Sequence, residues 1–354
     1  MPRNGLQEHV FCLRTVFDNI RHESAKLFAF IDVKDAFGSL DHQIMLNGMI
    51  QAGYPQHVIE VTRDLYTNSS FQLMTASGLT NKVTRGKGII QGCPWSVIVF
   101  IQGIDPWLRW MAHPYPDEHL PCPCQGYVDD VDMCRRSEAE MLEMIHESEQ
   151  FLQDTGMQAK HRKCALVIQR SGNNWYKRSN THRLQLVLQG DNIPVYNREQ
   201  PYTYLGHSVN MNGSAYRSQL DDITYNFENN PQKISSSPLP IAAKLEAVNA
   251  ILISKLNFYF CNIQFTEKLL KLFENKIVQE VRHWLALNNS CTRAFMFLPR
   301  CQGGLGLVKP ATMYHAKHVT FLLSLLNSDD PKVKDSARAA FHLHMSKRKV
   351  ANVR

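Results

Sequence analysis

The segment FAFIDVKDAF, residues 28–37, decides the fold of this chain. It continues an apolar run that begins at Lys26 and predicts a short buried strand ending at Asp32. A carboxylate directly after a buried strand lies at the rim of a sheet, where it can reach solvent and a ligand. A lone aspartate could equally be a strand cap, so a functional role for Asp32 needs support from a second segment of the sequence.

The segment GYVDDVDM, residues 126–133, provides that support. Apolar residues flank Asp129 and Asp130, which is typical of a tight hairpin whose turn is this acidic pair. An acidic surface turn is common, but two acidic strand ends in one chain favour a paired metal site, because hard oxygen ligands suit Mg²⁺. Three converging carboxylates meet the needs of two-metal phosphoryl transfer.

The stretches around these two segments predict a mixed α+β region. Helices are expected over 41–66 and 96–112, with strands within the intervening 71–90. A capping box at Ser137 and Glu140 begins a helix that runs to about Asp154. Further strands are expected over 165–168, 184–188 and 203–209.

The character of the chain changes near residue 230. NNPQK and SSSPLP form a polar stretch that predicts a linker or a helix-entry loop. Helices are expected after it over 241–256, 266–286 and 311–326, the second with one apolar face.

Composition limits the class of protein. The chain has 354 residues, 44% hydrophobic and 20% charged, which excludes disordered and low-complexity chains. Its longest apolar run is too short to span a bilayer, and no signal peptide is visible. We expect an intracellular protein that is not secreted and makes no use of a membrane, with its nine cysteines as free thiols.

Charge is distributed unevenly along the chain. Residues 215–354 carry 19 Lys and Arg against 10 Asp and Glu, a net charge of +9, whereas residues 1–214 carry a net charge of −2. This favours a polyanionic partner held mainly by the C-terminal region, although a solvated basic surface would look the same. The closing SKRK is a weak nuclear-targeting signal.

Five segments in order resemble motifs A to E of reverse transcriptases. They are FIDVKDAF, QGCPWSVIVF, YVDD, residues 156–167 and YLG. Residues 4–16 are similar to the stretch before motif A in non-LTR retrotransposons, and residues 280–307 resemble the thumb of the clade that inserts site-specifically into ribosomal DNA. The chain is identified as a member of this family.

The resemblance implies an α+β, right-hand polymerase core. Its expected parts are partial fingers and a palm with an antiparallel sheet (1–214), a helical thumb (215–330) and a basic C-terminal tail (331–354). The implied activity is RNA-directed DNA synthesis with two Mg²⁺ ions, for which Mn²⁺ could substitute. The implied partners are an RNA template, a DNA primer, the RNA–DNA hybrid and deoxynucleotide triphosphates, met in the nucleus at a chromosomal target or in the cytoplasm. The oligomeric state is left open.

The resemblance also assigns roles around the metal site. Asp32 and Asp129 would ligate both ions, with Asp130 beside them. Lys163 would donate a proton to the leaving pyrophosphate, although it could also be one of several solvated charges.

Nucleotide and primer contacts are assigned in the same way. Phe37 matches the aromatic steric gate that clashes with a ribose 2′-OH, the alternative being core packing. Gln91 and Gly92 would contact the nucleotide, because a glycine lets the backbone approach closely. The primer grip would consist of Tyr204, Leu205 and Gly206.

The departures from the family pattern motivate a second reading. Motif B has Cys93, Trp95 and Val97 at positions where the family usually has Asp, Leu and Pro, and motif D has Lys160 in place of Asn. No residues match the basic pair of the fingers, the zinc knuckle or the endonuclease. We therefore also expect a truncated chain, alternatively a decayed copy that binds RNA or hybrid without catalysis. An RNA-copying RNA polymerase is opposed by Phe37, and zinc binding by His113, His119, Cys122 and Cys124 is a weak match.

Overall fold

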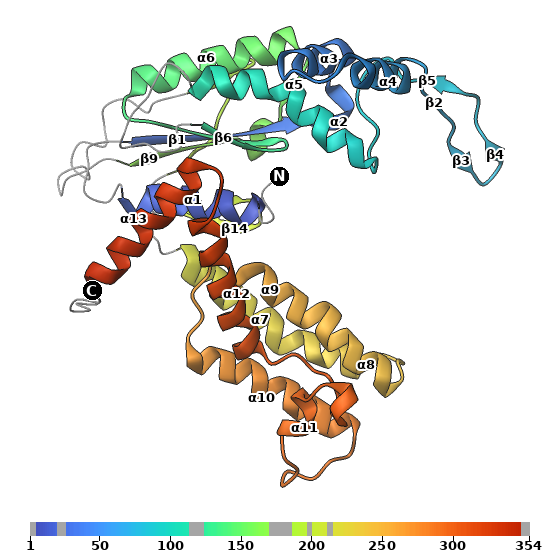
Figure 1. Ribbon diagram of the computed structural model, residues 1–354, viewed down its shortest axis with the longest axis vertical. Coiled ribbons are helices and arrows are strands. Elements are labelled where there is room, and N and C mark those ends of the chain that lie inside the picture. The colour runs from blue at the N-terminus through green and yellow to red at the C-terminus, as the bar shows by residue number, and fades with distance from the viewer. Residues whose placement is uncertain are drawn as a thin grey trace. The chain divides into compact units, whose positions relative to one another are not determined.

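The computed structural model describes residues 5–19, 26–112, 124–169, 186–196, 200–210 and 215–347. The chain forms two compact units. Figure 1 shows the chain coloured by residue number. The sheet unit comprises Val16–Leu205 and Asn210–Asn212, and the helical unit comprises Met1–Thr15, Gly206–Val209 and Gly213–Arg354. Within the described ranges, no helix is long and apolar enough to cross a membrane, and the cysteines are all free thiols.

A central sheet organises the sheet unit. Its strand order is β12-β9-β1-β7-β6, and β8 also pairs with β1. The pairs are antiparallel except β12 with β9, so the predicted antiparallel palm sheet is confirmed. The strands are β1 (Lys26–Lys34), β6 (Cys124–Tyr127), β7 (Asp130–Arg135), β8 (Gln158–Ala159), β9 (Ala165–Gln169) and β12 (Val195–Tyr196).

Strand β1 is longer than the sequence predicted. The expected end at Asp32 is wrong, because Asp32 pairs with Asp130 of β7 and Val33 pairs with Ala159 of β8. Side chains alternate along a strand. One face of β1 therefore carries the core residues Leu27, Ala29, Ile31 and Val33, and the other carries Phe28, Phe30 and Asp32.

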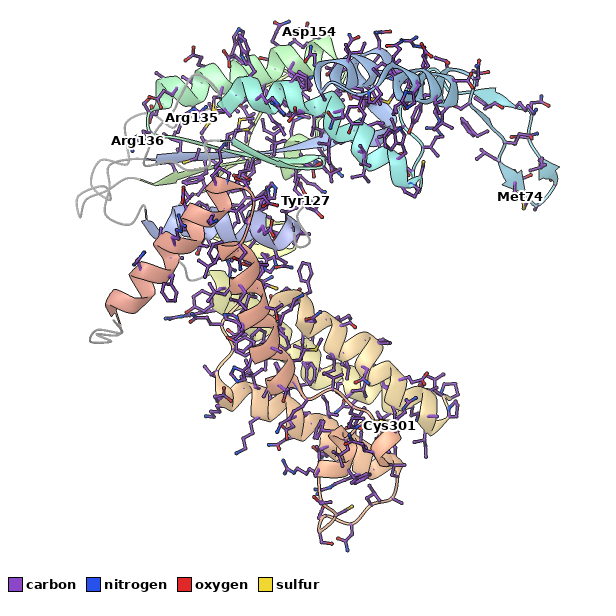
Figure 2. All side chains as sticks on the ribbon, viewed as in Figure 1. Met74, Tyr127, Arg135, Arg136, Asp154 and Cys301 are labelled. Atoms are coloured by element: carbon purple, nitrogen blue, oxygen red, sulfur yellow. The ribbon has the colours of Figure 1, made fainter. Side chains whose placement is uncertain are left out.

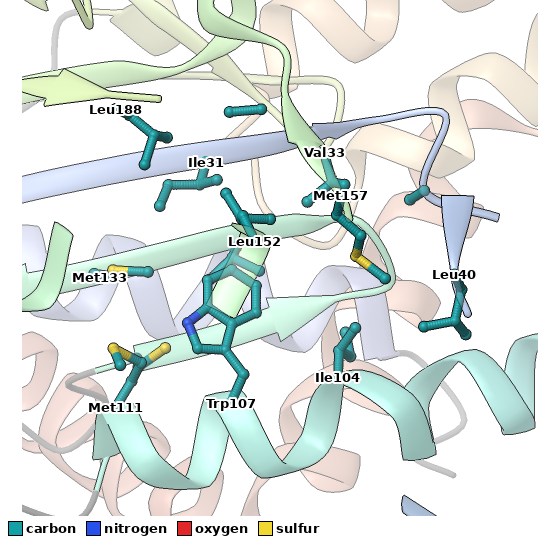
Figure 3. Close-up of a cluster of buried hydrophobic side chains, with 14 of the residues drawn as sticks. Ile31, Val33, Leu40, Ile104, Trp107, Met111, Met133, Leu152, Met157 and Leu188 are labelled. Carbon is teal, nitrogen blue, oxygen red and sulfur yellow. The ribbon is translucent and has the colours of Figure 1, made fainter. Parts of the chain in front are cut away.

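Two helices, α5 (Pro94–Ala112) and α6 (Glu138–Asp154), pack on the core face of the sheet. Figure 3 shows Trp107 and Ile104 of α5 pointing toward the sheet, within the buried cluster that also contains Ile31 and Met133. Each fully buried apolar side chain of this kind contributes roughly 1.5–3 kcal/mol. The aspartates and the aromatic rings beside them therefore lie on the opposite face of the sheet.

One predicted helix cap is confirmed, and one predicted helix is divided in two. Ser137 Oγ accepts a hydrogen bond from the Glu140 backbone N–H at 3.2 Å, so α6 begins where the sequence predicted. The single helix expected over 41–66 is two helices, α3 (His42–Gln51) and α4 (Gln56–Thr67). Gly53, with φ of 75°, ends the first, and Pro55 precedes the second.

The strands predicted within 71–90 form a narrow ribbon. It consists of the pairs β2 (Ser70–Phe71) with β5 (Val83–Thr84) and β3 (Met74–Thr75) with β4 (Gly78–Leu79). Met74 lies at its tip (Figure 2). A short pair later in the unit is β10 (Val187–Leu188) with β11 (Asp191–Asn192). The strand β13 (Tyr202–Tyr204) follows in this unit, and the next strand, β14 (His207–Val209), belongs to the helical unit. Residues 184–185 of one predicted strand lie outside the described residues.

The helical unit has its own apolar core. Leu270, Phe273, Ile277 and Val281 lie buried along one face of α10 (Glu267–Trp284), which confirms the predicted periodicity. The remaining helices are α7 (Ala215–Ser235), α8 (Ile241–Ala247), the π-helix η4 (Val248–Ile253), α9 (Ser254–Tyr259), α11 (Ala294–Phe297), α12 (Pro310–Leu326) and α13 (Pro331–Lys347). Helix α1 (Gly5–Asn19) begins in this unit and ends in the other.

The stretch NNPQK is not a linker. It lies inside α7, because Phe227, Pro231 and Ile234 recur at helical spacing and are buried. Only SSSPLP, which connects α7 to α8, matches the predicted loop.

Candidate active site

Asp32 and Asp130 are direct partners across the β1–β7 ladder, so their side chains leave the same face of the sheet. The expected turn at Asp129-Asp130 is wrong by one residue. Tyr127 pairs with Asp130, which leaves Val128 and Asp129 as the turn. Val128 has φ of 58°, in the left-handed region that a tight two-residue turn requires. Asp130 is therefore a strand residue, and Asp129 lies at the turn beside it.

The three carboxylates form one electrostatic group. Burial, followed by the charges of Asp129 and Asp32, raises the pKa of Asp130 to about 6. Asp32 is buried, and its Oδ2 accepts a hydrogen bond from Lys163 Nζ at 2.9 Å. That bond is the main cause of the raised pKa of Lys163. Burial is the larger cause of the raised pKa of Asp130, and the repulsion by the two neighbouring carboxylates, which adds to it, is what a bound cation would relieve.

The donor set suits a hard divalent cation, because all of it is carboxylate oxygen. The described residues nevertheless contain no group of three or more His, Cys, Asp or Glu side chains placed to hold a metal ion together. Lys163 instead contributes the positive charge at Asp32. Of the cysteines and histidines considered for zinc, Cys124 is buried in β6 and the other three lie outside the described residues.

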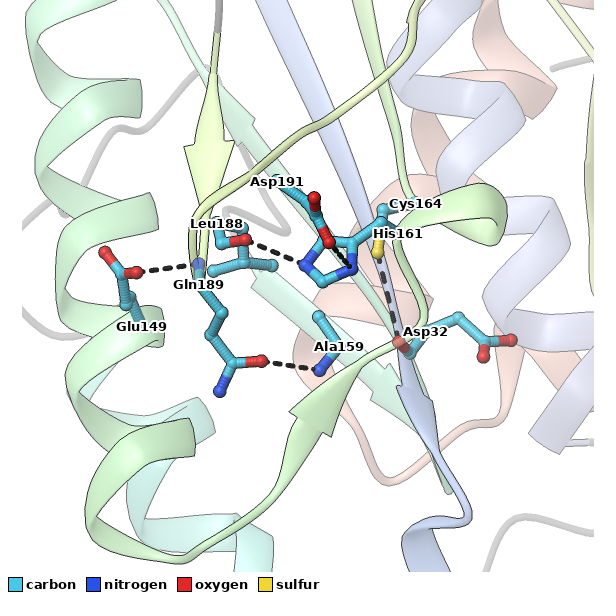
Figure 4. A network of polar contacts seen from close by, with 8 residues as sticks. All are labelled: Asp32, Glu149, Ala159, His161, Cys164, Leu188, Gln189 and Asp191. Atoms are coloured by element: carbon cyan, nitrogen blue, oxygen red, sulfur yellow. Dashed lines mark hydrogen bonds and ion pairs between the residues drawn. The ribbon is translucent and has the colours of Figure 1, made fainter.

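Polar contacts hold the turn that carries Lys163 on two sides. This turn, η2 (His161–Lys163), follows Lys160, whose backbone N–H donates to the Asp32 carbonyl at 2.8 Å. Figure 4 shows the contacts on the second side, where the His161 ring lies between the Leu188 carbonyl at 2.8 Å and the Asp191 carboxylate at 3.2 Å. The backbone at Lys163 is thus tied both to the strand of Asp32 and to the β10–β11 pair.

A backbone hydrogen bond connects motif A to the residues just before motif B. The Ile89 N–H donates to the Phe37 carbonyl at 2.7 Å, in the short helix α2 (Ala36–Ser39). The half-buried Phe37 ring stacks on Phe100 of α5, with centroids 4.8 Å apart and planes 5° from parallel. The Phe37 ring is therefore packed and also partly exposed. This is compatible with both interpretations from sequence, the steric gate and core packing.

Gln91 and Gly92 are exposed just before α5. Gly92 has φ of 85°, and a Cβ built on it would meet no atom within 4 Å. Backbone conformation, and not crowding by the protein, therefore requires glycine at this position, and the space beside it is open to a ligand.

Trp95, the bulky departure in motif B, is directed to the neighbouring helix. Its Nε1–H donates to Thr62 Oγ1 of α4 at 3.1 Å, and its ring meets Tyr54 edge-on. The next residue, Ser96, is buried and lies 3.0 Å from the Tyr66 hydroxyl. The extra volume of Trp95 thus serves to pack α5 against α4.

Motif E begins with strand β13, which is followed by a turn. Leu205 and Gly206 have φ of 48° and 74°, as a tight left-handed turn requires. Tyr204 is only 2% exposed and donates its hydroxyl to Asp132 at 2.8 Å. Tyr202 donates to the Lys163 carbonyl at 2.7 Å.

Sequence reasoning missed Asp132 and Tyr202. Strand alternation could have placed Asp132 on the face of Asp130, because the two are two residues apart. No local signal could have predicted that a distant tyrosine covers it. Burial raises the pKa of Asp132 to about 7, against the opposing effects of its hydrogen bonds from Tyr204 and Gln125.

Paired carboxylates on the two central strands of an antiparallel sheet, with motifs A to E in order, define a polymerase of the palm type. The family model described as reverse transcriptase (RNA-dependent DNA polymerase) matches residues 4–209, which is more than half of the chain. The chain therefore belongs to the reverse transcriptase family, and the predicted family and enzyme class are confirmed.

The relatives are proteins of retrotransposable elements. The Pol polyprotein of the type-2 element R2DM from Drosophila melanogaster is 22% identical over 314 residues, covering 87% of this chain and 29% of the relative. The corresponding R2 polyprotein of Nasonia vitripennis is 22% identical over 310 residues, covering 86% and 29%. The predicted resemblance to retrotransposon reverse transcriptases is confirmed, and the chain spans less than a third of either relative.

Among solved structures, the chain is similar to a telomerase from Candida albicans, with 9% identity and a TM-score of 0.44 over 99% of this chain and 53% of that one. The fold is established by the sheet and the family match rather than by this weak likeness.

Proposed function

We propose that this chain copies RNA into DNA by two-metal nucleotidyl transfer, as the polymerase part of a retrotransposon protein that primes synthesis at a nicked chromosomal target. The observation that carries the proposal is the pairing of Asp32 with Asp130 across β1 and β7, with Asp129 in the adjoining turn. This pairing brings the carboxylates of motifs A and C to one face of the sheet.

The carboxylates of Asp32, Asp129 and Asp130 would hold two Mg²⁺ ions, with Mn²⁺ as a substitute. When bound, such ions lower the pKa of the primer 3′-hydroxyl and neutralise charge on the leaving pyrophosphate. Lys163 carries its proton firmly at Nζ, because Asp32 raises its pKa. Since the Lys163 side chain is 58% exposed, it can turn from Asp32 to the leaving group and donate that proton.

Selection of deoxynucleotides is assigned to Phe37. Its ring has little freedom to move away from an incoming ribose, because Phe100 supports it from behind. A 2′-hydroxyl at this ring would clash. Gln91 and the open backbone at Gly92 would contact the nucleotide from the motif B side.

The helical unit supplies charge for the nucleic acid. Residues 215–354 carry a net charge of +9, which suits the phosphates of an RNA template, a DNA primer and their hybrid. Such contacts read backbone and shape, not base sequence. Priming at a chromosomal target, with ribosomal DNA as the site that the thumb resemblance favours, would place this activity in the nucleus.

Primer extension by the purified chain tests the proposal. The reaction contains an RNA template, a DNA primer, Mg²⁺ and deoxynucleotides, and the inactivating variant is Asp129→Ala/Asp130→Ala. The matched control is Asp221→Ala/Asp222→Ala, an adjacent acidic pair exposed on α7. We expect extension by the parent and the α7 variant, with a loss of at least about 10³-fold in the first variant.

Template–primer binding is measured beside extension, by fluorescence anisotropy at several salt concentrations. Strong, salt-dependent binding without extension by any variant would contradict the proposal and support a copy that binds without catalysis. Equal extension by the parent and Asp129→Ala/Asp130→Ala would remove the carboxylates from the mechanism.

A further inference from the structure

Asp132 is a carboxylate that the proposed reaction leaves without a role. It lies on β7 opposite Phe30 of β1 and shares the sheet face of Asp130. The residue is only 1% exposed. Because burying a carboxylate is costly unless hydrogen bonds stabilise it, an apolar residue would be the simpler choice for this position.

Two donors meet the Asp132 carboxylate. Tyr204 Oη donates to Oδ1 at 2.8 Å, and Gln125 Nε2 lies 3.4 Å from Oδ2. The Tyr204 ring also packs against Phe30, with centroids 5.2 Å apart. The hydrogen bond therefore joins β13, the first strand of motif E, to the strand that begins with Asp130.

The other end of β13 is joined to motif D. Tyr202 stacks on Phe30 at 4.4 Å and donates its hydroxyl to the Lys163 carbonyl at 2.7 Å. One three-residue strand thus spans from motif C to the turn that carries Lys163. The turn at Leu205 follows directly after it.

We infer that Asp132 is a positioning residue for the primer end. Through Tyr204 it holds β13, and with β13 the start of the Leu205–Gly206 turn, at a fixed place relative to Asp32 and Asp130. The inference rests on the proposed function, because that turn is the expected primer grip. It also changes the expected role of Tyr204, whose buried ring supports the turn and does not touch the primer itself.

Three variants test the inference in the full chain. Asp132→Leu removes the acceptor, and Tyr204→Phe removes one hydroxyl with little change of volume. Asp132→Asn keeps an oxygen that can accept from Tyr204, and Gln125 can turn its amide to present an oxygen to the new NH₂ group. The matched control is Ser148→Ala, which deletes a buried hydroxyl on α6 that donates to the Met144 carbonyl.

The readouts are the KM for primer, kcat at saturating primer, and the fluorescence of 2-aminopurine placed at the primer 3′ terminus on an RNA template. We expect Asp132→Leu and Tyr204→Phe to raise the primer KM roughly tenfold and to brighten the 2-aminopurine, because the terminus is no longer held. In both variants, kcat should change less than about twofold. Asp132→Asn and Ser148→Ala should keep a primer KM within about threefold of the parent value.

Three results would overturn the inference. They are an unchanged primer KM and terminus signal in Asp132→Leu and Tyr204→Phe, equal damage in Asp132→Asn and Asp132→Leu, and a fall in kcat alone that Ser148→Ala shares. If the parent binds primer without extending it, the proposed function fails, and the 2-aminopurine signal of Asp132→Leu against Asp132→Asn still decides the role of Asp132. If the parent extends primer and Asp132→Leu leaves its terminus seated, the inference about Asp132 alone fails.

Discussion

The sheet unit and the helical unit differ in how their important residues are brought together. In the sheet unit, Asp32 and Asp130 are far apart in the chain and meet through the register of β1 with β7. In the helical unit, the core residues of α10 recur every three or four positions and share a face through local geometry. The candidate catalytic carboxylates therefore depend on long-range backbone pairing, whereas the core of the helical unit depends on local periodicity.

The largest expected difference between the units comes from a glycine at a helix crossing. A Cβ on Gly48 of α3 would lie 1.9 Å from the Gln102 carbonyl oxygen of α5, so Gly48→Ala must push the two helices apart. We expect a loss of about 3 kcal/mol or more from the sheet unit, with the helical unit unaffected. Urea unfolding followed by mass-mapped proteolysis resolves the two units.

Gly86→Ala is the matched control for Gly48→Ala, because a Cβ there meets no atom within 4 Å and φ is not positive. Equal destabilisation of both units by Gly48→Ala would show that they unfold as one, and the comparison would no longer hold.

The two units should also respond to pH in opposite directions. Burial lowers the pKa of His207 to about 3 and of His9 to about 4, both in the helical unit. The unfolded chain then binds more protons than the folded chain below pH 6.5, so the helical unit loses stability as pH falls. At pH 4.5, roughly two units below the unfolded value, His207 alone should cost on the order of 3 kcal/mol.

The stability of the sheet unit should change with pH in the opposite direction. Burial raises the pKa of Asp130 to about 6 and of Asp132 to about 7, so the folded chain binds more protons and stability falls as pH rises from about 4 to 7. Proteolysis of each unit between pH 4.5 and 7 measures both trends. His207→Phe should remove roughly half of the acid sensitivity of the helical unit, because His9 contributes about as much. Parallel pH profiles in the two units would contradict this prediction.

A change at Phe37 should alter selectivity and not stability. Phe37→Val removes the ring that would exclude a 2′-hydroxyl, so we expect ribonucleotide incorporation to rise roughly tenfold to hundredfold relative to deoxynucleotides. Competing primer-extension reactions give the ratio of kcat/KM values. The matched control is Phe151→Leu, which breaks a similar stack with Trp107 on α5. An unchanged ratio in Phe37→Val would show that its ring is only a packing residue.

The smallest expected effect concerns two surface lysines of the helical unit. Lys268 and Lys271 are exposed one turn apart on α10. Replacing both by Gln should weaken template–primer binding severalfold and reduce the slope of log K against log salt by about 1 to 2. Lys82→Gln/Lys87→Gln makes the same charge change in the sheet unit. A larger effect of that second pair would transfer the main polyanion contact to the sheet unit.

The sequence predicted much of the site because its signals are local. The Ser137 cap and the apolar face of α10 each depend on neighbouring residues, and both are present as predicted. The family that motifs A to E indicate is confirmed as well. Two of the errors fall where a strand or helix is extended by a partner that local sequence does not show. Strand β1 continues past Asp32 because β8 pairs with its end, and α7 continues through Pro231 because its apolar face is buried.

The roles of single residues divide in the same way, between those that local sequence predicts and those that depend on tertiary partners. The sequence by itself determined the family, the candidate carboxylates, the aromatic ring at Phe37 and the separation of acidic and basic halves, because these are properties of residue type and spacing. The tertiary structure decided that Asp130 and not Asp129 faces Asp32 across the ladder, that Trp95 packs on α4, and that Tyr204 is buried against Asp132. Register, burial and hydrogen-bond partners arise from chain segments that meet only on folding, and no local pattern encodes them.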